Sequence, residues 1–140
     1  MGITFFAICV AGTLLLKKDV VDPVSEIKNE TDIKSELIRI FNPVFGEKIS
    51  SPLKISGEAR GTWFFEASFP IFLVDWDGKI IAQGIATAKG DWMTENFVPF
   101  EAELTFEKPS YGERGAIILK KDNPSGLSEN DDAIEISILF

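Results

Sequence analysis

The chain has 140 residues and a formal net charge of -8, with no histidine and one cysteine. The lack of histidine excludes Ser-His-Asp triads and HExxH zinc sites, and a single cysteine excludes an internal disulfide or a thiolate zinc site. An acidic chain repels nucleic acid, so no nucleic-acid partner is expected. The classes that remain are a carboxylate or Ser/Lys enzyme, a calcium-type oxygen site, and a binding module without chemistry.

The first 18 residues are mostly apolar. Ile3 to Leu16 include no charged residue, and Lys17 and Lys18 follow. This run is shorter than the 20 or so residues of a bilayer-spanning helix, but it matches the hydrophobic region of a signal peptide or a short membrane anchor. We therefore interpret residues 1–18 as a signal or anchor segment and expect an extracytoplasmic protein, either tethered to the membrane or secreted. Residues 19–36 mix both charges with a proline and are interpreted as a tether.

Residues 37–140 show the alternation that is typical of β-strands. In residues 98–106 apolar and polar side chains alternate, as expected for a strand with one buried face, and the pattern recurs in residues 134–140. Further strands are predicted at residues 37–41, 53–59, 65–76, 79–88 and 115–121. Asp77-Gly78 predicts a hairpin turn between two of them. About seven short strands without an amphipathic helix predict an all-β fold, an antiparallel β-sandwich, over residues 37–140.

A set of motifs in this domain occurs together in a known family. In chain order they are SPLKISGEAR at 51–60, WFFEASFP at 63–70, DWDG at 75–78, GDWMT at 90–94, FVPF at 97–100 and KDNPSGLSENDD at 121–132. Together they resemble the immunoglobulin-like domain of bacterial spore germination proteins, which is often found beside a GerMN domain. The resemblance implies an immunoglobulin-like β-sandwich on the outer side of a bacterial membrane, with no known catalytic residues. At 140 residues we expect no accompanying GerMN domain.

An acidic loop at residues 122–132 is the candidate metal site. Carboxylate and carbonyl oxygens are the ligands that calcium prefers, although this spacing is not that of an EF-hand loop. The alternative, which we favour, is that these side chains bond to nearby backbone groups and shape a turn. No other cofactor is expected. The candidate ligands are Asp122, Asn123, Glu129, Asp131 and Asp132.

Two carboxylates near an arginine are the candidate acid/base groups. Glu58 and Glu66 flank Arg60 in a segment rich in aromatic residues, and paired carboxylates can catalyse glycoside hydrolysis. However, Glu58 and Arg60 share one face of an extended chain, where an ion pair is the ordinary outcome. A pair between Arg60 and Glu66 is a second structural interpretation. We favour a structural ion pair and expect no enzymatic activity.

Aromatic side chains are the candidate recognition residues. Both faces of the predicted strand at 65–76 are apolar, and one of them presents Phe72 and Trp76. An apolar face that the protein leaves uncovered marks a partner surface. Trp63, Trp76 and Trp92 are also suited to stacking on sugar rings, whereas the alternative places aromatic residues in the core.

Together these observations predict a non-catalytic, extracytoplasmic binding or accessory module of a bacterial cell envelope. Its expected partner is a protein or a cell-wall glycan, recognised through a sheet edge or through the face of Phe72 and Trp76. The membrane is contacted through the N-terminal segment. The alternatives are a small carboxylate-dependent hydrolase, using Glu58, Glu66 or the acidic loop, and a purely structural spacer.

Overall fold

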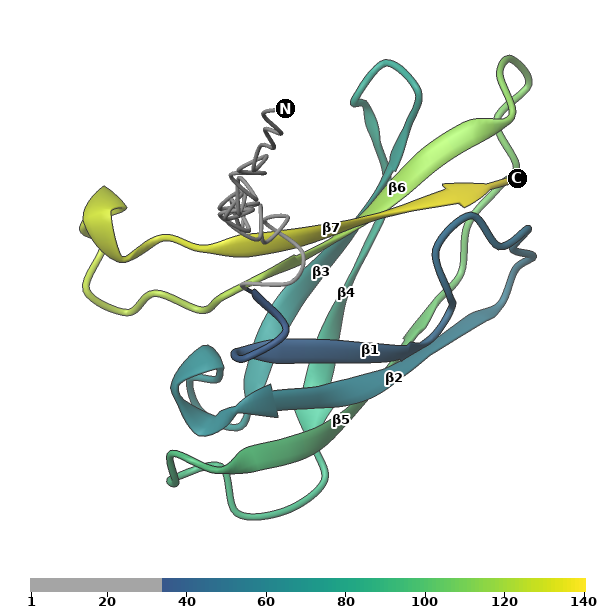
Figure 1. The fold of residues 1–140 in the computed structure, drawn as a ribbon. Coiled ribbons are helices and arrows are strands. Elements are labelled where there is room, and N and C mark those ends of the chain that lie inside the picture. Colours follow the sequence, from purple (N-terminus) through teal and green to yellow (C-terminus); the bar gives the residue numbers. More distant parts are fainter. Residues whose placement is uncertain (1–33) are drawn as a thin grey trace, which may run out of the picture.

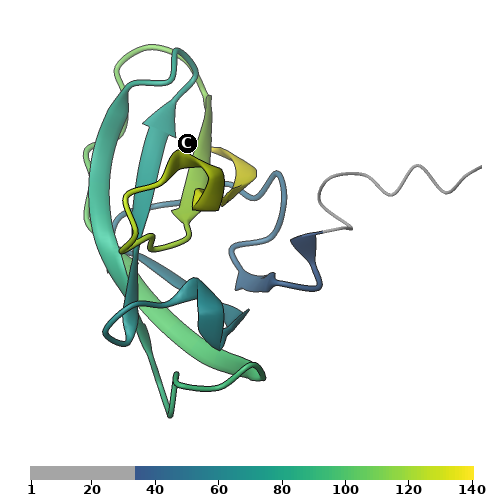
Figure 2. The same cartoon turned by 90° about the vertical axis from the view of Figure 1, so that its left-hand side faces the viewer.

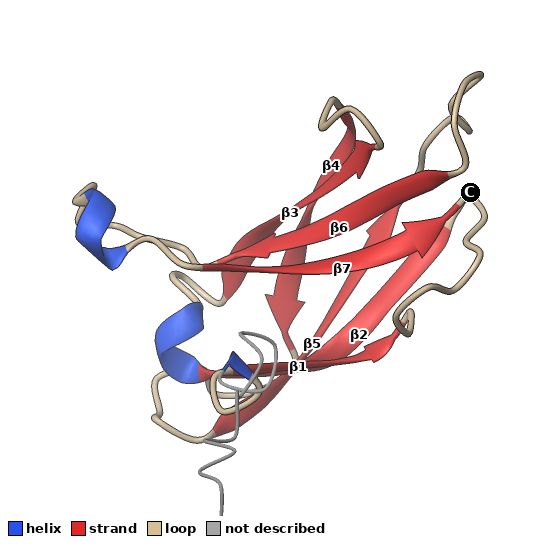
Figure 3. Ribbon diagram, turned by 45° about the horizontal axis from the view of Figure 1, so that its top comes forward, coloured by secondary structure: helices blue, strands red, loops and turns tan. Residues whose placement is uncertain are grey.

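The computed structural model of the protein describes residues 34–140, which form seven β-strands and two short 3-10 helices (Figures 1 and 3). The strands are β1 (Ile38–Asn42), β2 (Leu53–Arg60), β3 (Ser68–Asp75), β4 (Ile80–Ala88), β5 (Phe97–Leu104), β6 (Arg114–Lys120) and β7 (Ala133–Leu139). The short helices are η1 (Gly61–Trp63) and η2 (Ser128–Asn130). No helix in this range is long and apolar enough to cross a membrane. The predicted signal or anchor segment lies outside the described residues.

The predicted strands are confirmed, with one correction at β3. In β5 the apolar positions Val98, Phe100 and Leu104 are buried and the glutamates between them are exposed. The strand predicted from residue 65 begins only at Ser68. The cause is a tight turn: Phe65 and Ser68 exchange backbone hydrogen bonds, and Glu66 and Ala67 have φ angles of 50° and 65°. Residues with positive φ cannot continue a strand.

The seven strands form one antiparallel sheet in the order β1-β2-β5-β4-β3-β6-β7, which folds over to make the two layers of an immunoglobulin-like sandwich (Figure 2). β4 and β5 are joined through only two residue pairs, Thr87 with Glu101 and Ala88 with Phe100. Away from these two pairs β4 and β5 diverge, and each strand continues in a different layer. One layer therefore contains β1, β2 and β5, and the other contains β4, β3, β6 and β7.

The chain closes the sandwich by pairing with both layers in turn. β1 pairs with β2, and the segment at residues 46–49 then pairs in parallel with the end of β7. The N–H of Gly46 donates to the Ser137 carbonyl (2.7 Å) and the N–H of Ile49 donates to the Leu139 carbonyl (2.8 Å). This segment occupies the edge of β7 that would otherwise face solvent.

The core lies between the two layers and is rich in aromatic rings. Phe69 packs edge-to-face on Phe100 at 4.9 Å between ring centroids, and Phe64 packs on Phe69 at 5.2 Å. Such pairs add about 0.5–1.5 kcal/mol to the free energy gained by burial alone. The largest of the fully buried side chains are Trp63, Phe69, Phe100, Ile38, Ile55, Ile71, Leu73, Leu104, Ile117, Leu119, Ile138 and Pro43.

Gly57 allows β1 to lie close against β2. A Cβ atom added to Gly57 would come within 2.1 Å of the Arg39 carbonyl oxygen and 2.9 Å of the Phe100 ring. Both distances are far shorter than van der Waals contact. Only glycine therefore fits at this position of β2.

Candidate functional site

The predicted calcium loop is held together by its own side chains. The Asn123 amide donates to the Asp131 carboxylate (2.8 Å), and the Asn123 oxygen accepts a hydrogen bond from the Ser125 hydroxyl (2.5 Å). Asp132 forms an ion pair with Lys34 at 3.1 Å. These contacts are the local bonds that asparagine and aspartate make when they shape a turn.

The five predicted calcium ligands are not brought to a common point. The backbone N–H of Asp122 donates to the Trp63 carbonyl (3.1 Å), and Glu129 lies in η2. Within the part of the chain that the structure describes, no three His, Cys, Asp or Glu side chains lie close enough to hold a metal ion. Calcium binding by this loop stays a prediction that the geometry does not support.

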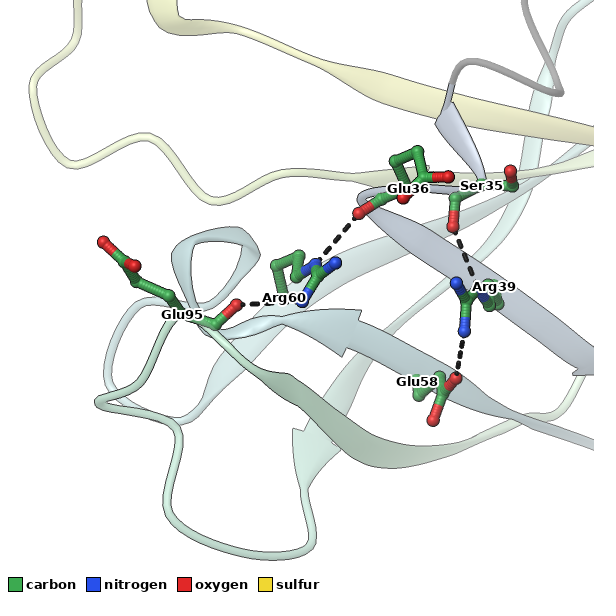
Figure 4. A network of polar contacts seen from close by, with 6 residues as sticks. All are labelled: Ser35, Glu36, Arg39, Glu58, Arg60 and Glu95. Atoms are coloured by element: carbon green, nitrogen blue, oxygen red, sulfur yellow. Dashed lines mark hydrogen bonds and ion pairs between the residues drawn. The ribbon is translucent and has the colours of Figure 1, made fainter.

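The predicted carboxylate and arginine cluster has different partners from those expected (Figure 4). Glu58 forms its ion pair with Arg39 on the neighbouring strand β1, at 3.1 Å, and not with Arg60. Arg60 instead donates to the backbone carbonyls of Glu36 (3.0 Å) and Glu95 (3.4 Å). The expected pair between Arg60 and Glu66 is likewise replaced, and Glu66 is exposed in the turn before β3.

The two arginines of this network share one aromatic ring. The guanidinium carbons of Arg39 and Arg60 lie 4.0 Å and 3.9 Å from the centroid of the Phe97 ring. A cation over a ring face is attracted by the ring's quadrupole. The cluster therefore ties β1, β2 and β5 together at the surface, which is a structural role.

The three predicted tryptophans do not form one platform. Trp63 has 1% of its surface exposed and belongs to the core, so it cannot offer its ring to a sugar. Its buried indole nitrogen has no hydrogen-bond partner. Trp92 is half-buried and packs against the core from the loop before β5. Trp76 alone is largely exposed, at 56%.

Trp76 forms an aromatic corner with Tyr111, a residue that the sequence analysis missed. The two rings meet edge-to-face at 5.8 Å, and Tyr111 is 75% exposed. A Cβ atom on Gly112, which has a φ of +86°, would lie 2.4 Å from the Trp76 ring, so the ring sits directly on the glycine backbone. A hollow at this corner is also lined by Glu113 and Arg114. The sequence indicates a turn here through Lys108-Pro109-Ser110, but nothing in it places Tyr111 beside Trp76.

Phe72 lies on an apolar surface that crosses three strands. We call this surface the outer face: it faces away from the core. In register, Phe72 is flanked by Gln83 on β4 and by Ile118 on β6, and Pro70 lies beside Ile85. The most exposed members are Ile85, at 63%, and Ile80, at 54%. The outer face consists of Pro70, Phe72, Ile80, Ile85 and Ile118.

The sequence pattern alone could not identify the outer face. The run at residues 79–88 contains Ile80, Ile81 and Ile85, and apolar residues in a strand usually belong to the core. A register shift in the pairing of β3 with β4, at Val74 opposite Ile80, places Ile80 on the outer side together with Ile85. A bulge of this kind changes which side chains face outward.

Comparisons with known proteins give one result that bears on this fold. The profile of the family described as "Immunoglobulin-like domain of bacterial spore germination" matches residues 37–128. No curated protein and no solved structure gave a significant match. The match ends before β7, which the structure shows to be an integral strand of the same sheet. The fold and the profile agree with the motifs in the sequence, and the chain belongs to the family of immunoglobulin-like domains of bacterial spore germination.

Proposed function

We propose that this protein is a non-catalytic accessory module of the bacterial cell envelope, and that it recognises another protein through the outer face. The observation that supports this most directly is a group of apolar side chains on adjacent strands, of which Ile80 and Ile85 are exposed and Pro70, Phe72 and Ile118 are half-buried. Apolar side chains that gather at the surface of a folded domain can mark an interaction site. Membership of a family associated with spore germination agrees with an accessory role.

The arrangement of charged groups favours binding over catalysis. Glu58 forms an ion pair with Arg39, Asp131 accepts a hydrogen bond from Asn123 within the loop, and Asp132 forms an ion pair with Lys34. Glu66 is exposed in the turn before β3. A carboxylate hydrolase needs two acidic groups that face one substrate across a cleft. The candidates predicted from the sequence are not placed in this way.

The extracytoplasmic location is part of the same proposal. It is supported by the apolar run at residues 3–16 and by the family, whose name refers to spore germination. The domain has no disulfide to stabilise it, because the single cysteine lies at position 9 in the apolar run. The aromatic core supplies the stability instead.

A second candidate function is recognition of a cell-wall glycan, and the aromatic corner favours it. Trp76 and Tyr111 are both exposed, and Glu113 and Arg114 line the same hollow. Exposed rings beside charged side chains can stack on a sugar and bond its hydroxyl groups. This corner lies beyond the end of β3, so it can be changed without altering the outer face.

Binding experiments with the full chain separate the two functions. Immobilised protein is incubated with detergent-solubilised envelope proteins, and in parallel the protein is sedimented with purified peptidoglycan. We expect Phe72→Thr and Ile118→Thr to lose the retained envelope protein, because both changes make the outer face polar. Tyr111→Ser should have no effect on this retention.

The control is Leu127→Thr, an equally polar change at an exposed apolar residue outside the outer face. Melting curves establish that each variant is folded. Retention that is the same for wild type and both outer-face variants would contradict protein recognition. Sedimentation with peptidoglycan that Tyr111→Ser abolishes would instead support the glycan function.

A further inference from the structure

The edge of β4 differs from the other edges of the sheet. β7 is covered by residues 46–49, and the five-residue β1 includes Arg39. In contrast, β4 has nine residues, Ile80–Ala88, with no charged residue and no proline. Charges and prolines are the usual means by which proteins protect an edge strand from pairing with another chain. β4 lacks this protection.

Among the described strands, none pairs with the β5 side of β4 before Thr87. Thr87 pairs with Glu101, and the N–H of Lys89 donates to the Pro99 carbonyl (2.8 Å), so alternate residues of this stretch bond toward β5. Because backbone groups alternate in direction along a strand, the N–H and C=O groups of Ile85 and Gln83 also point toward the β5 side of β4. Pairing between β4 and β5 has ended by then, because the described pairs stop at Thr87.

Two hollows run along this unpaired edge. One, of about 720 Å³, is lined by Ile85 and Thr87 from β4 and by Glu101 and Glu103 from β5. The other, of about 660 Å³, lies beside Ile80 and the segment that follows β5. Gly84, between them, packs inward on Leu104, so β5 passes beneath β4 at this point. Space is thus available beside the edge at Ile85 and at Ile80.

The floor of the first hollow is polar, and its lysines are matched by an equal number of glutamates. Lys54 lies opposite Glu103 in the register of β2 and β5, and Lys89 forms an ion pair with Glu101 at 2.8 Å. A strand beside β4 would place alternate side chains over this floor and the others next to the exposed Ile85. Because the charges of the floor are already paired, the side chains of the added strand that face it are expected to be polar and uncharged. The side chains that lie next to Ile85 are expected to be apolar, since they would continue the outer face.

We propose that the edge of β4 binds an extended segment of a partner protein by strand addition, and that this segment alternates apolar with uncharged polar residues. The segment bonds to the backbone of Gln83 and Ile85, and its apolar side chains lie beside Ile85 in line with Phe72. This proposal rests on the proposed function, because it describes how the protein that recognises the outer face binds to the neighbouring edge of β4. Main-chain bonds supply affinity in this mode, and alternate side chains supply specificity.

Gln83→Pro tests the backbone bond directly. It removes the outward N–H, and proline is tolerated on edge strands. The matched control is Gln83→Thr, which keeps the N–H and loses the same exposed side chain. The probe is a phage-displayed library of random peptides of about ten residues, the upper length of an ordinary strand, selected on the full-length wild-type chain.

Selected peptides should show the alternating pattern and should bind Gln83→Pro about tenfold more weakly than Gln83→Thr, because an unmade bond leaves a polar group unpaired. N-methylation of alternate peptide bonds should weaken binding to wild type by a similar factor, a result that needs no protein variant to fold. The proposal is overturned if no selected peptide is sensitive to either change, or if the library gives no binder.

The two proposals fail in distinguishable ways. Retention of envelope protein that is lost in Phe72→Thr but equal in Gln83→Pro and Gln83→Thr would preserve recognition by the outer face and overturn strand addition. Retention that is unchanged in all three variants would overturn both.

Discussion

Gly57→Ala is expected to destabilise the domain strongly, because the added methyl group has no space. Its carbon would lie 2.1 Å from the Arg39 carbonyl oxygen, whereas carbon–oxygen contacts are about 3.3 Å or longer. β1 must therefore move away by about 1 Å, which weakens its bonds to β2 and pulls Ile38 from the core. Overpacking costs about 1–3 kcal/mol, and partial exposure of a buried isoleucine adds to this. We expect a loss of about 3 kcal/mol in the free energy of unfolding.

Urea and thermal unfolding of the full chain, followed by circular dichroism, measure this loss. A change of about 3 kcal/mol in a domain of this size lowers the melting temperature by roughly 12 °C or more. Gly90→Ala is the control, because a Cβ atom at Gly90 meets nothing within 4 Å. It should leave stability within about 0.5 kcal/mol of wild type. A loss below about 1 kcal/mol in Gly57→Ala would refute the close packing of β1 on β2.

Three further predictions concern the candidate sites. Millimolar calcium should leave the melting temperature unchanged, since the acids of the 122–132 loop do not converge; a clear upward shift would establish an ion site. A double-mutant cycle with Arg39→Ala and Glu58→Ala should give a coupling energy below about 1 kcal/mol, because the pair is solvent-exposed, and a coupling of several kcal/mol would contradict this. In variants that keep one tryptophan, acrylamide should quench the fluorescence of Trp76 strongly and that of Trp63 weakly; equal quenching would show that Trp63 is not buried.

The strands could be predicted from the sequence because their burial follows a period of two. β5 and β7 each alternate over their whole length, and both lie where the alternation predicted them. The start of β3 could not be predicted in the same way. Glu66 and Ala67 adopt positive φ, which is uncommon outside glycine, asparagine and aspartate, so no local signal marks the turn there.

The candidate site was less predictable than the fold, because it depends on contacts between distant segments. Glu58 and Arg60 are two residues apart in sequence, yet the partner of Glu58 is Arg39 on another strand. Trp63 and Trp76 are equally aromatic, and only the packing of η1 against the core distinguishes the buried ring from the exposed one. The sequence also could not indicate that pairing between β4 and β5 stops after two residue pairs.

The coverage of β7 by residues 46–49 determines how many chains can join end to end. A fibre of stacked sheets needs two open edges on every molecule, one to accept a strand and one to offer it. Among the described strands, β7 is occupied by the chain's own backbone along the stretch that ends at Leu139. Within the layer of β4, β3, β6 and β7, strand addition can therefore occur only at β4, and this layer accepts a single partner strand.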